Sequence, residues 1–359
     1  MNVLFPADLA RLSRRDFLRR SGAGMLGLLG LPFLGPLERL ERLQRAPLAG
    51  AEEPITLGRA VDDSVPVYDR PSLSGKLKRM YYRDVILDID EVTIGDENPP
   101  HNRVWYHVRG EGYAHSGKVQ PVQLRLNQPA TSVPAGGQLA EVSVPYTDIF
   151  RDLEQTDRVK YRLYYATLHW VRQVEKDSQG QTWYGVWDDK FKQLYYARAE
   201  HLRLIGAEET APISPQVSLE EKRIEVWRAA QLVIAYERDE PALITKTSTG
   251  GRFIDGDYTT PSGLYVTSRK RPSRHMASED LAAPNSYDLP GVPWVCYITK
   301  NGISFHGTFW HNDFGKPRSH GCINLPSAAA QWIYRWTQPS VPFGEETFTD
   351  KTGTRVDII

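Results

Sequence analysis

Residues 305–324 bring three histidines and one of the two cysteines of the chain onto a short, glycine-punctuated stretch, FHGTFWHNDFGKPRSHGCIN. A thiol with a pKa of about 8.5 is a poor nucleophile at neutral pH, so a catalytic cysteine needs an imidazole nearby. Cys322 is the candidate nucleophile, and the candidate bases are His306, His311 and His320. His320 is only two residues from Cys322, and side chains so close in sequence usually point apart. His306 ends a predicted strand that can pair beside Cys322, and we therefore predict that it is the base.

Gly321, immediately before Cys322, permits a tight turn at the nucleophile. In such a turn the amides of Gly321 and Cys322, together with that of His320, are expected to converge on one point. Negative charge on an attacked carbonyl oxygen would be held there, as in an oxyanion hole, where losing one donor typically costs about 10²- to 10³-fold in rate. The stretch therefore predicts attack by a cysteine on a carbonyl group.

Two other uses of these side chains remain open. A zinc site is one, because imidazole and thiolate are ordinary zinc ligands, although the spacings match no familiar zinc module. Its ligands would be His306, His311, His320 and Cys322. A disulfide between Cys296 and Cys322 is the other, which an oxidising compartment would favour. Cys296 lies in the apolar run 294–298, where a buried cysteine behaves as a small hydrophobic residue. We favour the nucleophile and expect neither a metal nor an organic cofactor.

Other charged residues are assigned to the surroundings of the site. His311 and Asp313 are interpreted as polar residues of a lid rather than as catalysts. His275 and the charged run 269–274 are predicted to lie on an insertion that covers the cleft or in a solvated loop, and the solvated loop is preferred. The residues of this run that could meet a substrate carboxylate are Arg269, Lys270 and Arg271.

Short β-strands are predicted to position the reactive stretch, because apolar runs alternate with turn-forming clusters from residue 222 onward. The predicted strands cover residues 224–226, 232–235, 243–247, 264–267, 294–298 and 303–306. Thr259-Thr260-Pro261-Ser262-Gly263 has the composition of a turn, and a helix is predicted from Ser327 to Trp336. Residues 218–359 are therefore predicted to form a mostly β catalytic domain.

Two strings in this domain resemble the signature of the YkuD-type L,D-transpeptidases. They are His306-Gly307-Thr308 and Ser319-His320-Gly321-Cys322-Ile323-Asn324. Residues 222–250 and the Thr260-Pro261-x-Gly263 string fit the same family, so the resemblance covers roughly residues 220–359. It implies a β-sandwich-like domain with a short helix. In the implied site, Cys322 is the nucleophile, His306 is the base, and the main-chain carbonyl of Gly307 orients the imidazole. Ser319, His320 and Gly321 shape the turn, which Asn324 supports.

One departure from the family concerns spacing. Twelve residues, 307–318, separate His306 from Ser319, towards the short end for the family, so the reach of the lid between them is expected to differ. Position 307 is glycine where some relatives carry serine, which leaves only a main-chain contact to hold the base.

The resemblance implies a two-step reaction on peptidoglycan stem peptides. The Cys322 thiolate would attack the carbonyl of the L-centre at position three of a tetrapeptide stem, expel the terminal D-alanine and pass the acyl group to an amine on a neighbouring stem. Water in place of the amine would make the protein a carboxypeptidase. A carbapenem would be expected to acylate Cys322.

Two further function classes are disfavoured. A non-catalytic wall-binding protein is disfavoured by the intact Ser-His-Gly-Cys string at residues 319–322. A papain-like peptidase is disfavoured because its cysteine usually precedes its histidine in the chain, and here Cys322 follows His306.

The preceding half of the chain is predicted to form two small β-barrels, residues 55–125 and 138–206, with a linker at 129–137 that is rich in Pro, Gly, Ser and Thr. The two barrels share a pattern. The string VWYHV at 104–108, followed by GYA, parallels TWYGV at 182–186, followed by YYA.

This pattern resembles bacterial Src-homology-3-like domains that are appended to wall enzymes. Exposed aromatic residues such as Tyr113 and Tyr196 could then stack on sugar or peptide faces of the wall polymer. Packing within the small domains is the alternative role for these rings.

Residues 1–51 are predicted to be an export signal and linker. The string SRRDFLRR at 13–20 is followed by an apolar run, 23–34, that is too short to span a bilayer comfortably. Its paired arginines resemble the twin-arginine signal that sends folded proteins across the bacterial inner membrane. Ala49-Gly50-Ala51 supplies a cleavage site, and only a retained segment would tether the protein to a membrane. A basic amphipathic helix lying on a membrane is the alternative. The expected location is the periplasm or the cell wall.

The composition limits the partners. Forty-four basic residues balance forty-four acidic ones in 359 residues, so no whole-protein field favours nucleic acid or an anionic surface. A hydrophobic content of 40% and an aromatic content of 11% allow a real core, and the length suggests two or three domains. We expect a globular monomer that acts on peptidoglycan stem peptides and not on nucleic acid.

Overall fold

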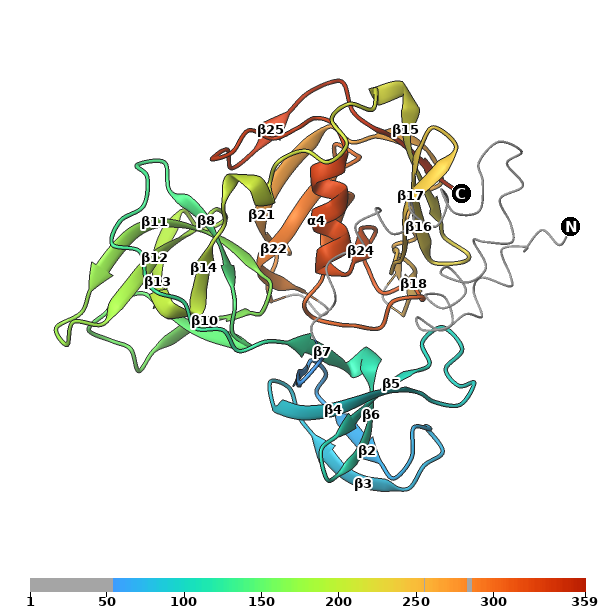
Figure 1. The fold of residues 1–359 in the computed structure, drawn as a ribbon, viewed down its shortest axis with the longest axis horizontal. Helices are drawn as coiled ribbons and strands as arrows, with labels where there is room; N and C mark the ends of the chain where they lie inside the picture. Colours follow the sequence, from blue (N-terminus) through green and yellow to red (C-terminus); the bar gives the residue numbers. More distant parts are fainter. Residues whose placement is uncertain (1–53, 255, 283–285) are drawn as a thin grey trace, which may run out of the picture.

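The computed structural model describes residues 54–254, 256–282 and 286–359. The predicted fold class, mostly β, is confirmed. Figure 1 shows three parts, which we call the first part (residues 55–125, blue to cyan), the second part (138–206, green) and the third part (218–359, yellow to red). The predicted signal lies outside the described residues. In the described ranges no helix has the length and apolar character needed to cross a membrane.

The first and second parts each hold one seven-stranded antiparallel sheet. The elements of the first part are β1 (Leu57–Ala60), β2 (Val65–Tyr68), β3 (Leu77–Tyr81), β4 (Ile86–Ile94), β5 (Val104–Val108), β6 (Gly112–His115), η1 (Ser116–Lys118) and β7 (Val119–Val122). Those of the second part are β8 (Gln138–Val142), β9 (Tyr146–Phe150), β10 (Val159–Tyr164), β11 (Leu168–Lys176), β12 (Thr182–Asp188), β13 (Gln193–Arg198), η2 (Ala199–His201) and β14 (Leu202–Leu204).

The two sheets have the same strand order. The first runs β3-β2-β6-β5-β4-β1-β7 and the second β10-β9-β13-β12-β11-β8-β14, so each strand takes the place of the one seven earlier. The repeated sequence pattern falls on matching hairpins, in which Tyr106 pairs with Ala114 and Tyr184 with Ala197. Both tyrosines are buried in the cores of their sheets. The sequence pattern is therefore a structural repeat.

Tyr113 and Tyr196 are half-buried and contact neighbours within their own sheets. The ring of Tyr113 lies 4.8 Å from that of His107, and the hydroxyl of Tyr196 donates to Glu175 at 3.1 Å. Binding of the wall by these rings stays a prediction.

The third part holds two five-stranded sheets and a helix between them (Figure 1). One sheet has the order β17-β16-β15-β26-β20, and the other has the order β24-β23-β22-β21-β25. Its elements, with two short helices that precede or begin it, are η3 (Ala207–Glu209), η4 (Leu219–Glu221), β15 (Lys222–Trp227), β16 (Leu232–Glu237), β17 (Glu240–Lys246), β18 (Arg252–Phe253), β19 (Gly256–Asp257), β20 (Gly263–Val266), β21 (Arg269–Ala277), β22 (Asp288–Tyr297), β23 (Ser304–Gly307), β24 (Ile323–Leu325), α4 (Ser327–Trp336), β25 (Phe348–Thr349) and β26 (Arg355–Ile358).

Helix α4 is amphipathic, and its apolar residues recur at the spacing of one helical face. Ala330, Ile333 and Trp336 are buried in one core with strands of both sheets. That core continues into the second part, where Leu168 and Trp170 join it. The second part is therefore docked on the third through shared hydrophobic burial.

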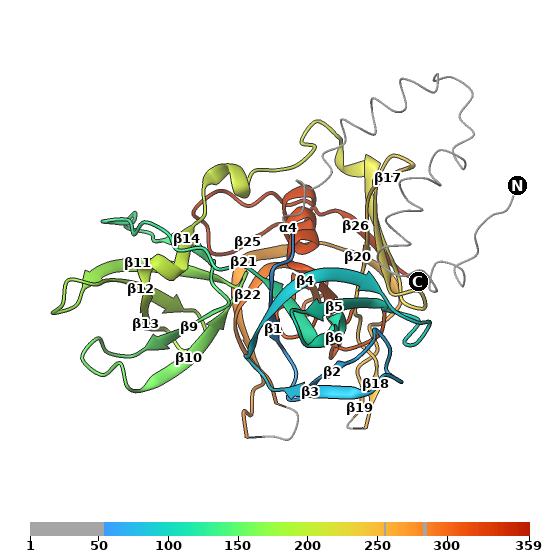
Figure 2. The same cartoon turned by 60° about the horizontal axis from the view of Figure 1, so that its bottom comes forward.

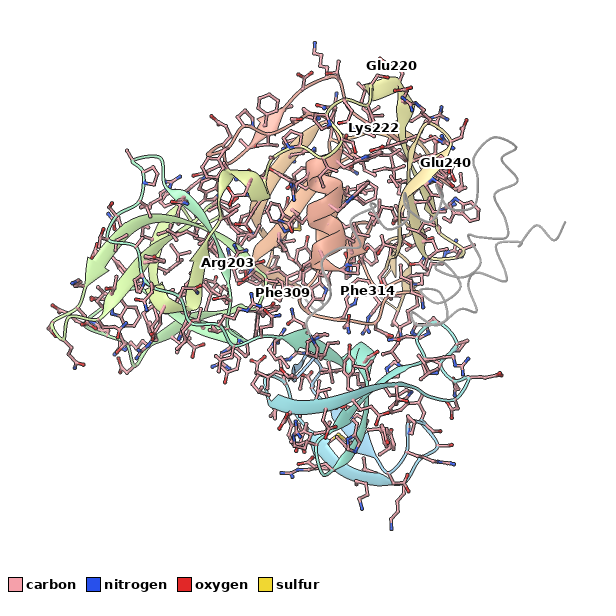
Figure 3. The ribbon with its side chains drawn as sticks, viewed as in Figure 1. Arg203, Glu220, Lys222, Glu240, Phe309 and Phe314 are labelled. Atoms are coloured by element: carbon pink, nitrogen blue, oxygen red, sulfur yellow. The ribbon has the colours of Figure 1, made fainter. Side chains whose placement is uncertain are left out.

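Two buried lysines close the C-terminal end of α4. Lys270 Nζ donates to the carbonyls of Tyr334 at 2.8 Å and Thr337 at 2.6 Å, and Lys222 Nζ donates to that of Trp336 at 3.1 Å (Figure 3 labels Lys222). A cation is favourable here because the last carbonyls of a helix carry partial negative charge. Burial lowers the pKa of Lys270 to about 8. Lys270 is thus a structural residue, and the expectation that it could meet a substrate is wrong.

The prediction of an insertion or solvated loop at residues 269–274 is also wrong. These residues begin β21, which pairs with β22 along its length. His275 is buried, with Nδ1 2.6 Å from Asp188 Oδ2 of the second part and Nε2 in contact with Asp288. Because Asp188 lies 87 residues away in sequence, no local pattern could show that this charged strand is buried.

A rise in pH is expected to weaken the contact between the second and third parts. Burial alone lowers the pKa of His275, but the hydrogen bonds and charges of Asp188 and Asp288 raise it overall. A raised histidine pKa adds stability that is fully present below about pH 6.5 and is lost as the pH rises through the folded-state value. Thermal unfolding should therefore show the wild type losing more stability than His275→Gln between about pH 6 and about pH 9. Equal losses in both proteins would contradict this prediction. Besides Asp188 and Asp288, His275 contacts Asp189 through its main-chain N–H and the rings of Tyr161 and Phe191.

Candidate active site

Cys322 lies immediately before β24, beside the parallel strand β23. The register pairs Phe305 with Ile323 and His306 with Asn324, so one step earlier Ser304 faces Cys322. Ser304 Oγ lies 3.6 Å from Cys322 Sγ. The strand that was predicted to end at His306 therefore lies beside Cys322.

His306 is buried, and its Nδ1 lies 3.0 Å from the carbonyl oxygen of Gly307. A carbonyl only accepts hydrogen bonds, so Nδ1 carries the proton and Nε2 is left as the acceptor. This is the contact that the family resemblance implied for Gly307. A side chain at position 307 would force its neighbours to move, because a Cβ there would lie 2.7 Å from Pro293 Cγ and 3.2 Å from Ser327 Cα.

The two cysteines have opposite environments. Burial alone would raise the pKa of Cys322, but the hydrogen bond and charge of His306, with the hydrogen bond of Ser304, lower it below its ordinary value. Burial raises the pKa of Cys296 to about 11. A thiolate is the reactive form of cysteine, so the geometry favours reaction at Cys322 and makes Cys296 inert.

The alternative of a disulfide between Cys296 and Cys322 is wrong. Both cysteines are free, and Cys296 belongs to the core that packs on α4. Cys322 lies across the sheet from that core, with its Sγ beside Ser304.

The turn before Cys322 is braced by two hydroxyl groups. Ser319 Oγ accepts from the N–H of Gly321 at 3.2 Å and donates to the carbonyl of Cys322. Thr260 Oγ1 donates to the carbonyl of Gly321 at 2.8 Å and accepts from the N–H of Gly250 at 2.8 Å. Gly321 has a φ of +120°, which glycine adopts without the strain of a side chain.

Gly250 allows another segment to approach this turn closely. A Cβ at position 250 would lie 2.0 Å from the carbonyl oxygen of Tyr258 and 2.8 Å from the N atom of Gly321. Residue 250 also forms an isolated parallel bridge with Ser319. Backbone contact at Gly250 therefore fixes the turn from one side.

The predicted oxyanion hole needs a correction. The N–H of Gly321 is used within the turn, because it donates to Ser319 Oγ. The N–H of Cys322 makes no hydrogen bond to any residue that the structure describes. Of these two amides, that of Cys322 is therefore the one left to face an oxyanion.

His320 is exposed and lies among aromatic rings. Its ring centroid is 4.3 Å from that of Tyr258, 5.8 Å from that of Phe253 and 6.3 Å from that of Tyr287. Its exposure distinguishes it from His306, which is buried, in agreement with the choice of His306 as base.

His311 is a buried structural residue. Burial lowers its pKa to about 3, so the ring is neutral. Its Nδ1 accepts from the N–H of Asp313 at 3.3 Å, which makes Nε2 the donor. The partner of Nε2 is the side-chain amide of Asn324, at 3.1 Å. Asn324 Oδ1 has no other partner among the described residues. Turning the amide so that Oδ1 accepts from His311 Nε2–H therefore gives both of these groups a hydrogen bond.

Loop 307–318, between the base and the turn, is anchored on the first part. Asn312 Nδ2 lies 3.2 Å from each of three acceptors, the hydroxyl of Tyr106 and the carbonyls of Ser116 and Val119. The N–H of Asn312 donates to the carbonyl of Gly117 at 3.3 Å. Figure 2 shows the first part in front of the third.

Phe309, in the same loop, lies where the three parts meet (Figure 3). Its carbonyl accepts from Arg59 Nη2 of the first part at 2.7 Å, and its ring stacks on Tyr164 of the second part at 5.4 Å. The Arg59 guanidinium also lies 4.0 Å from the centroid of the Tyr164 ring. One buried arginine therefore joins the loop to both N-terminal parts.

Asp313 completes the anchoring and is not an exposed lid residue. It is buried and lies 2.8 Å from His101 Nε2 of the first part, 2.6 Å from Lys316 Nζ and 3.0 Å from Arg318 Nη1. Burial alone would raise its pKa, but the hydrogen bonds of His101 and Lys316 hold it well below its usual range. The loop is thus supported from outside rather than free to cover the cleft.

A zinc site is not supported by the arrangement. Within the described ranges, no three His, Cys, Asp or Glu side chains could hold a metal ion together. His311, one of the supposed ligands, already uses both ring nitrogens in hydrogen bonds.

Thr260→Val is expected to lower the free energy of unfolding by about 1–3 kcal/mol and to lower the reactivity of Cys322. Valine keeps the shape of threonine but leaves the N–H of Gly250 and the carbonyl of Gly321 without their buried partner. Urea unfolding and the rate of thiol alkylation measure the two effects. Thr259→Val is the matched control, because Thr259 is exposed. An effect of equal size in the control would refute the bracing role.

Sequence reasoning missed two contributors and gave no role to a third. Ser304 lies two residues before His306 and so on the same face of the strand, which the period of two could have shown. Nothing in the sequence near Gly250 indicates its role, because a glycine is needed there only to let Gly321 approach closely. The Thr260-Pro261-x-Gly263 string does not show that the Thr260 hydroxyl contacts Gly250 and Gly321.

One family model matches the region of the chain that contains the candidate site. Residues 221–358 match the family model YkuD, the L,D-transpeptidase catalytic domain. A comparison with curated proteins gives no match.

Solved structures similar to this chain include three L,D-transpeptidase-related ones. The Ldtfm–avibactam carbamoyl enzyme is 24% identical over 39% of this chain and 49% of its own, with a TM-score of 0.30. A cysteine-to-serine mutant of the Enterococcus faecium L,D-transpeptidase is 22% identical over 44% and 55%, with a TM-score of 0.29. L,D-transpeptidase 3 from Mycobacterium tuberculosis is 17% identical over 64% and 98%, with a TM-score of 0.31. This chain spans about half the length of the first two.

Proposed function

We propose, taking as premise the match of residues 221–358 to the L,D-transpeptidase catalytic domain, that this protein cross-links peptidoglycan through a thioester on Cys322. The observation that carries the proposal is the position of Cys322 beside β23, the strand that holds His306 and Ser304. These neighbours lower the pKa of the Cys322 thiol. The imidazole is in turn held by the carbonyl of Gly307 in the tautomer that can take the thiol proton. Such a pair is the arrangement that cysteine acyl transfer needs.

In the first step, the Cys322 thiolate attacks the carbonyl carbon of the third residue of a tetrapeptide stem. The sulfur–carbon bond forms, and the N–H of Cys322 stabilises the negative charge on the carbonyl oxygen. When this intermediate collapses, the carbon–nitrogen bond breaks, and the protonated His306 gives its proton to the leaving D-alanine amine. The product is a thioester on Cys322.

In the second step, an amine of a neighbouring stem attacks the thioester. His306 takes a proton from that amine, the new amide forms, and the thiolate of Cys322 leaves. If water attacks in place of the amine, the product is a shortened stem and the reaction is that of a carboxypeptidase. In the proposed mechanism, Ser319, His320 and Gly321 shape the turn, and no metal or organic cofactor takes part.

We further propose that the protein acts outside the cytoplasmic membrane as a monomer, after export through the twin-arginine signal near its N-terminus. The first and second parts are proposed to be Src-homology-3-like domains, which their common strand order supports. Tyr113 and Tyr196 are the residues proposed to contact the wall polymer.

The experiment that tests the function is incubation of the purified protein with tetrapeptide muropeptides, followed by mass spectrometry. Cross-linked dimers with release of D-alanine would support the proposal. Shortened stems without dimers would indicate a carboxypeptidase, and binding to sacculi without any product would indicate a wall-binding protein. A carbapenem should also add covalently to the wild type and not to Cys322→Ala.

A further inference from the structure

Arg269 is an exposed cation at the start of β21. Two other arginines of the strand, Arg271 and Arg274, form ion pairs with Asp189 of the second part. Arg269 forms no ion pair with any residue in the described ranges. Its charge is therefore available to a ligand.

Strand pairing places Arg269 in the same row as the nucleophile. The register pairs Arg269 with Tyr297 and Tyr297 with Ser304, and Ser304 contacts Cys322. Residues paired in this way project from the same face of a sheet, and neighbouring strands lie about 4.8 Å apart. Arg269 and Cys322 thus belong to one face, with Tyr297 and Ser304 between them.

The opposite face of these strands confirms the assignment. Lys270, next to Arg269, donates to carbonyls at the end of α4. Cys296 and Phe305, next to Tyr297 and Ser304, lie in the core that α4 covers. The row that contains Arg269 therefore projects away from α4, on the side of the reactive sulfur.

The guanidinium of Arg269 is exposed, but it lies against the ring of Tyr297, in the row of residues that leads to Cys322. It lies 3.9 Å from the centroid of the Tyr297 ring, which is itself nearly buried. An arginine stacked on an aromatic face keeps its N–H groups at the edge of the plane, where they can bind a carboxylate in a bidentate manner. Stacking also reduces the entropy that such binding would cost.

We propose that Arg269 binds the terminal carboxylate of the donor stem. The inference rests on the proposed function, in which the bond that breaks joins the third residue to a terminal D-alanine. That carboxylate lies one residue beyond the attacked carbonyl, roughly 4 Å farther from the sulfur. The backbone of Arg269 lies two strands beyond Ser304, but its guanidinium lies over the ring of Tyr297, one strand beyond Ser304. One strand spacing of about 4.8 Å is close to this distance. A stem longer by one residue would place its carboxylate beyond this reach, so Arg269 selects tetrapeptide donors.

The other exposed cations near the site provide the controls. Arg252 pairs with Asp257, and Arg318 pairs with Asp313. Lys300, in the turn between β22 and β23, has no ion pair in the described ranges, but no aromatic ring holds it. Lys300→Gln is therefore the matched control for Arg269→Gln.

The test compares donor stems that end in a carboxylate with donors in which that group is a carboxamide. The wild type should favour the carboxylate donor by roughly 10- to 100-fold in kcat/KM, the range for a charged hydrogen bond. Arg269→Gln should lose this preference by slowing only on the carboxylate donor, Arg269→Lys should restore part of it, and Lys300→Gln should keep it. The rate of alkylation of Cys322 by iodoacetamide should stay unchanged in all three variants.

Equal slowing of Arg269→Gln on both donors, or a wild type without preference, would overturn the inference while leaving the function intact. Loss of preference in Lys300→Gln alone would assign the carboxylate to Lys300 instead. If amidation of a side-chain carboxyl on the third residue removes the effect of Arg269→Gln, the terminal assignment is wrong. A wild type that forms no product from either donor and no carbapenem adduct would overturn the proposed function as well.

Discussion

Replacing Cys322 by alanine is expected to lower kcat for cross-link formation by about 10⁴- to 10⁶-fold, the range seen when a catalytic nucleophile is removed. No other group near the site can form the thioester, because the hydroxyl of Ser304 could give only an oxygen ester and the other cysteine of the chain, Cys296, lies in the core. The measurement is the rate of dimer formation from muropeptides, followed by mass spectrometry. The same variant should form no covalent adduct with a carbapenem.

Cys296→Ala is the matched control for this prediction. It removes the other sulfur from a fully buried position, so it should lower stability by a small cavity cost of roughly 1 kcal/mol while kcat stays near that of the wild type. Retention of cross-linking by Cys322→Ala, or its loss in Cys296→Ala at a temperature where the variant is folded, would refute the assignment of the nucleophile.

Replacing His306 by glutamine is expected to lower kcat by about 10²- to 10⁴-fold, the usual contribution of a general acid–base. It should also raise the pKa of the Cys322 thiol. In the wild type, burial acts to raise that pKa and His306 acts to lower it, with a net lowering. Without the imidazole the burial effect dominates, so the thiolate should form only at higher pH. The pH dependence of alkylation by iodoacetamide measures this shift directly.

Ser304→Ala is a second variant in which the pKa of Cys322 should change, but by less than in His306→Gln. Ser304 contributes a weaker lowering of the same pKa through its contact with Sγ, so its removal should shift the alkylation profile in the same direction by less. An unchanged profile in His306→Gln would mean that the imidazole does not stabilise the thiolate. In that case the base would have to be sought elsewhere.

The local structure around the candidate site is the part that the sequence predicts best. A strand ending at His306, a helix from Ser327 to Trp336 and a thiol beside an imidazole all follow from short-range patterns, because strand and helix periods and the glycine at 321 are local properties. The role of the Gly307 carbonyl followed only from the family resemblance. The repeated hairpin of the first and second parts was visible because aromatic residues recur in both copies.

The error at residues 269–274 comes from contact between residues far apart in sequence. A charged run at 269–274 is typical of a solvated loop, yet Asp188 and Asp189 supply the partners that let His275 and the strand be buried. The expected use of the Gly321 amide failed for another reason, because the hydroxyl of Ser319 competes for that donor. Local hydrogen bonds of this kind depend on side-chain rotamers that a sequence pattern does not specify.

The anchoring of Asn312 limits how the polypeptide could be rearranged. The first repeat supplies acceptors for the side-chain amide of Asn312, which lies only a few residues after His306. A graft from a relative would have to bring back those acceptors, and an arginine at position 59, to keep the loop in place. The first part and the loop that follows His306 are therefore held together by these contacts, so a change in one is expected to disturb the other.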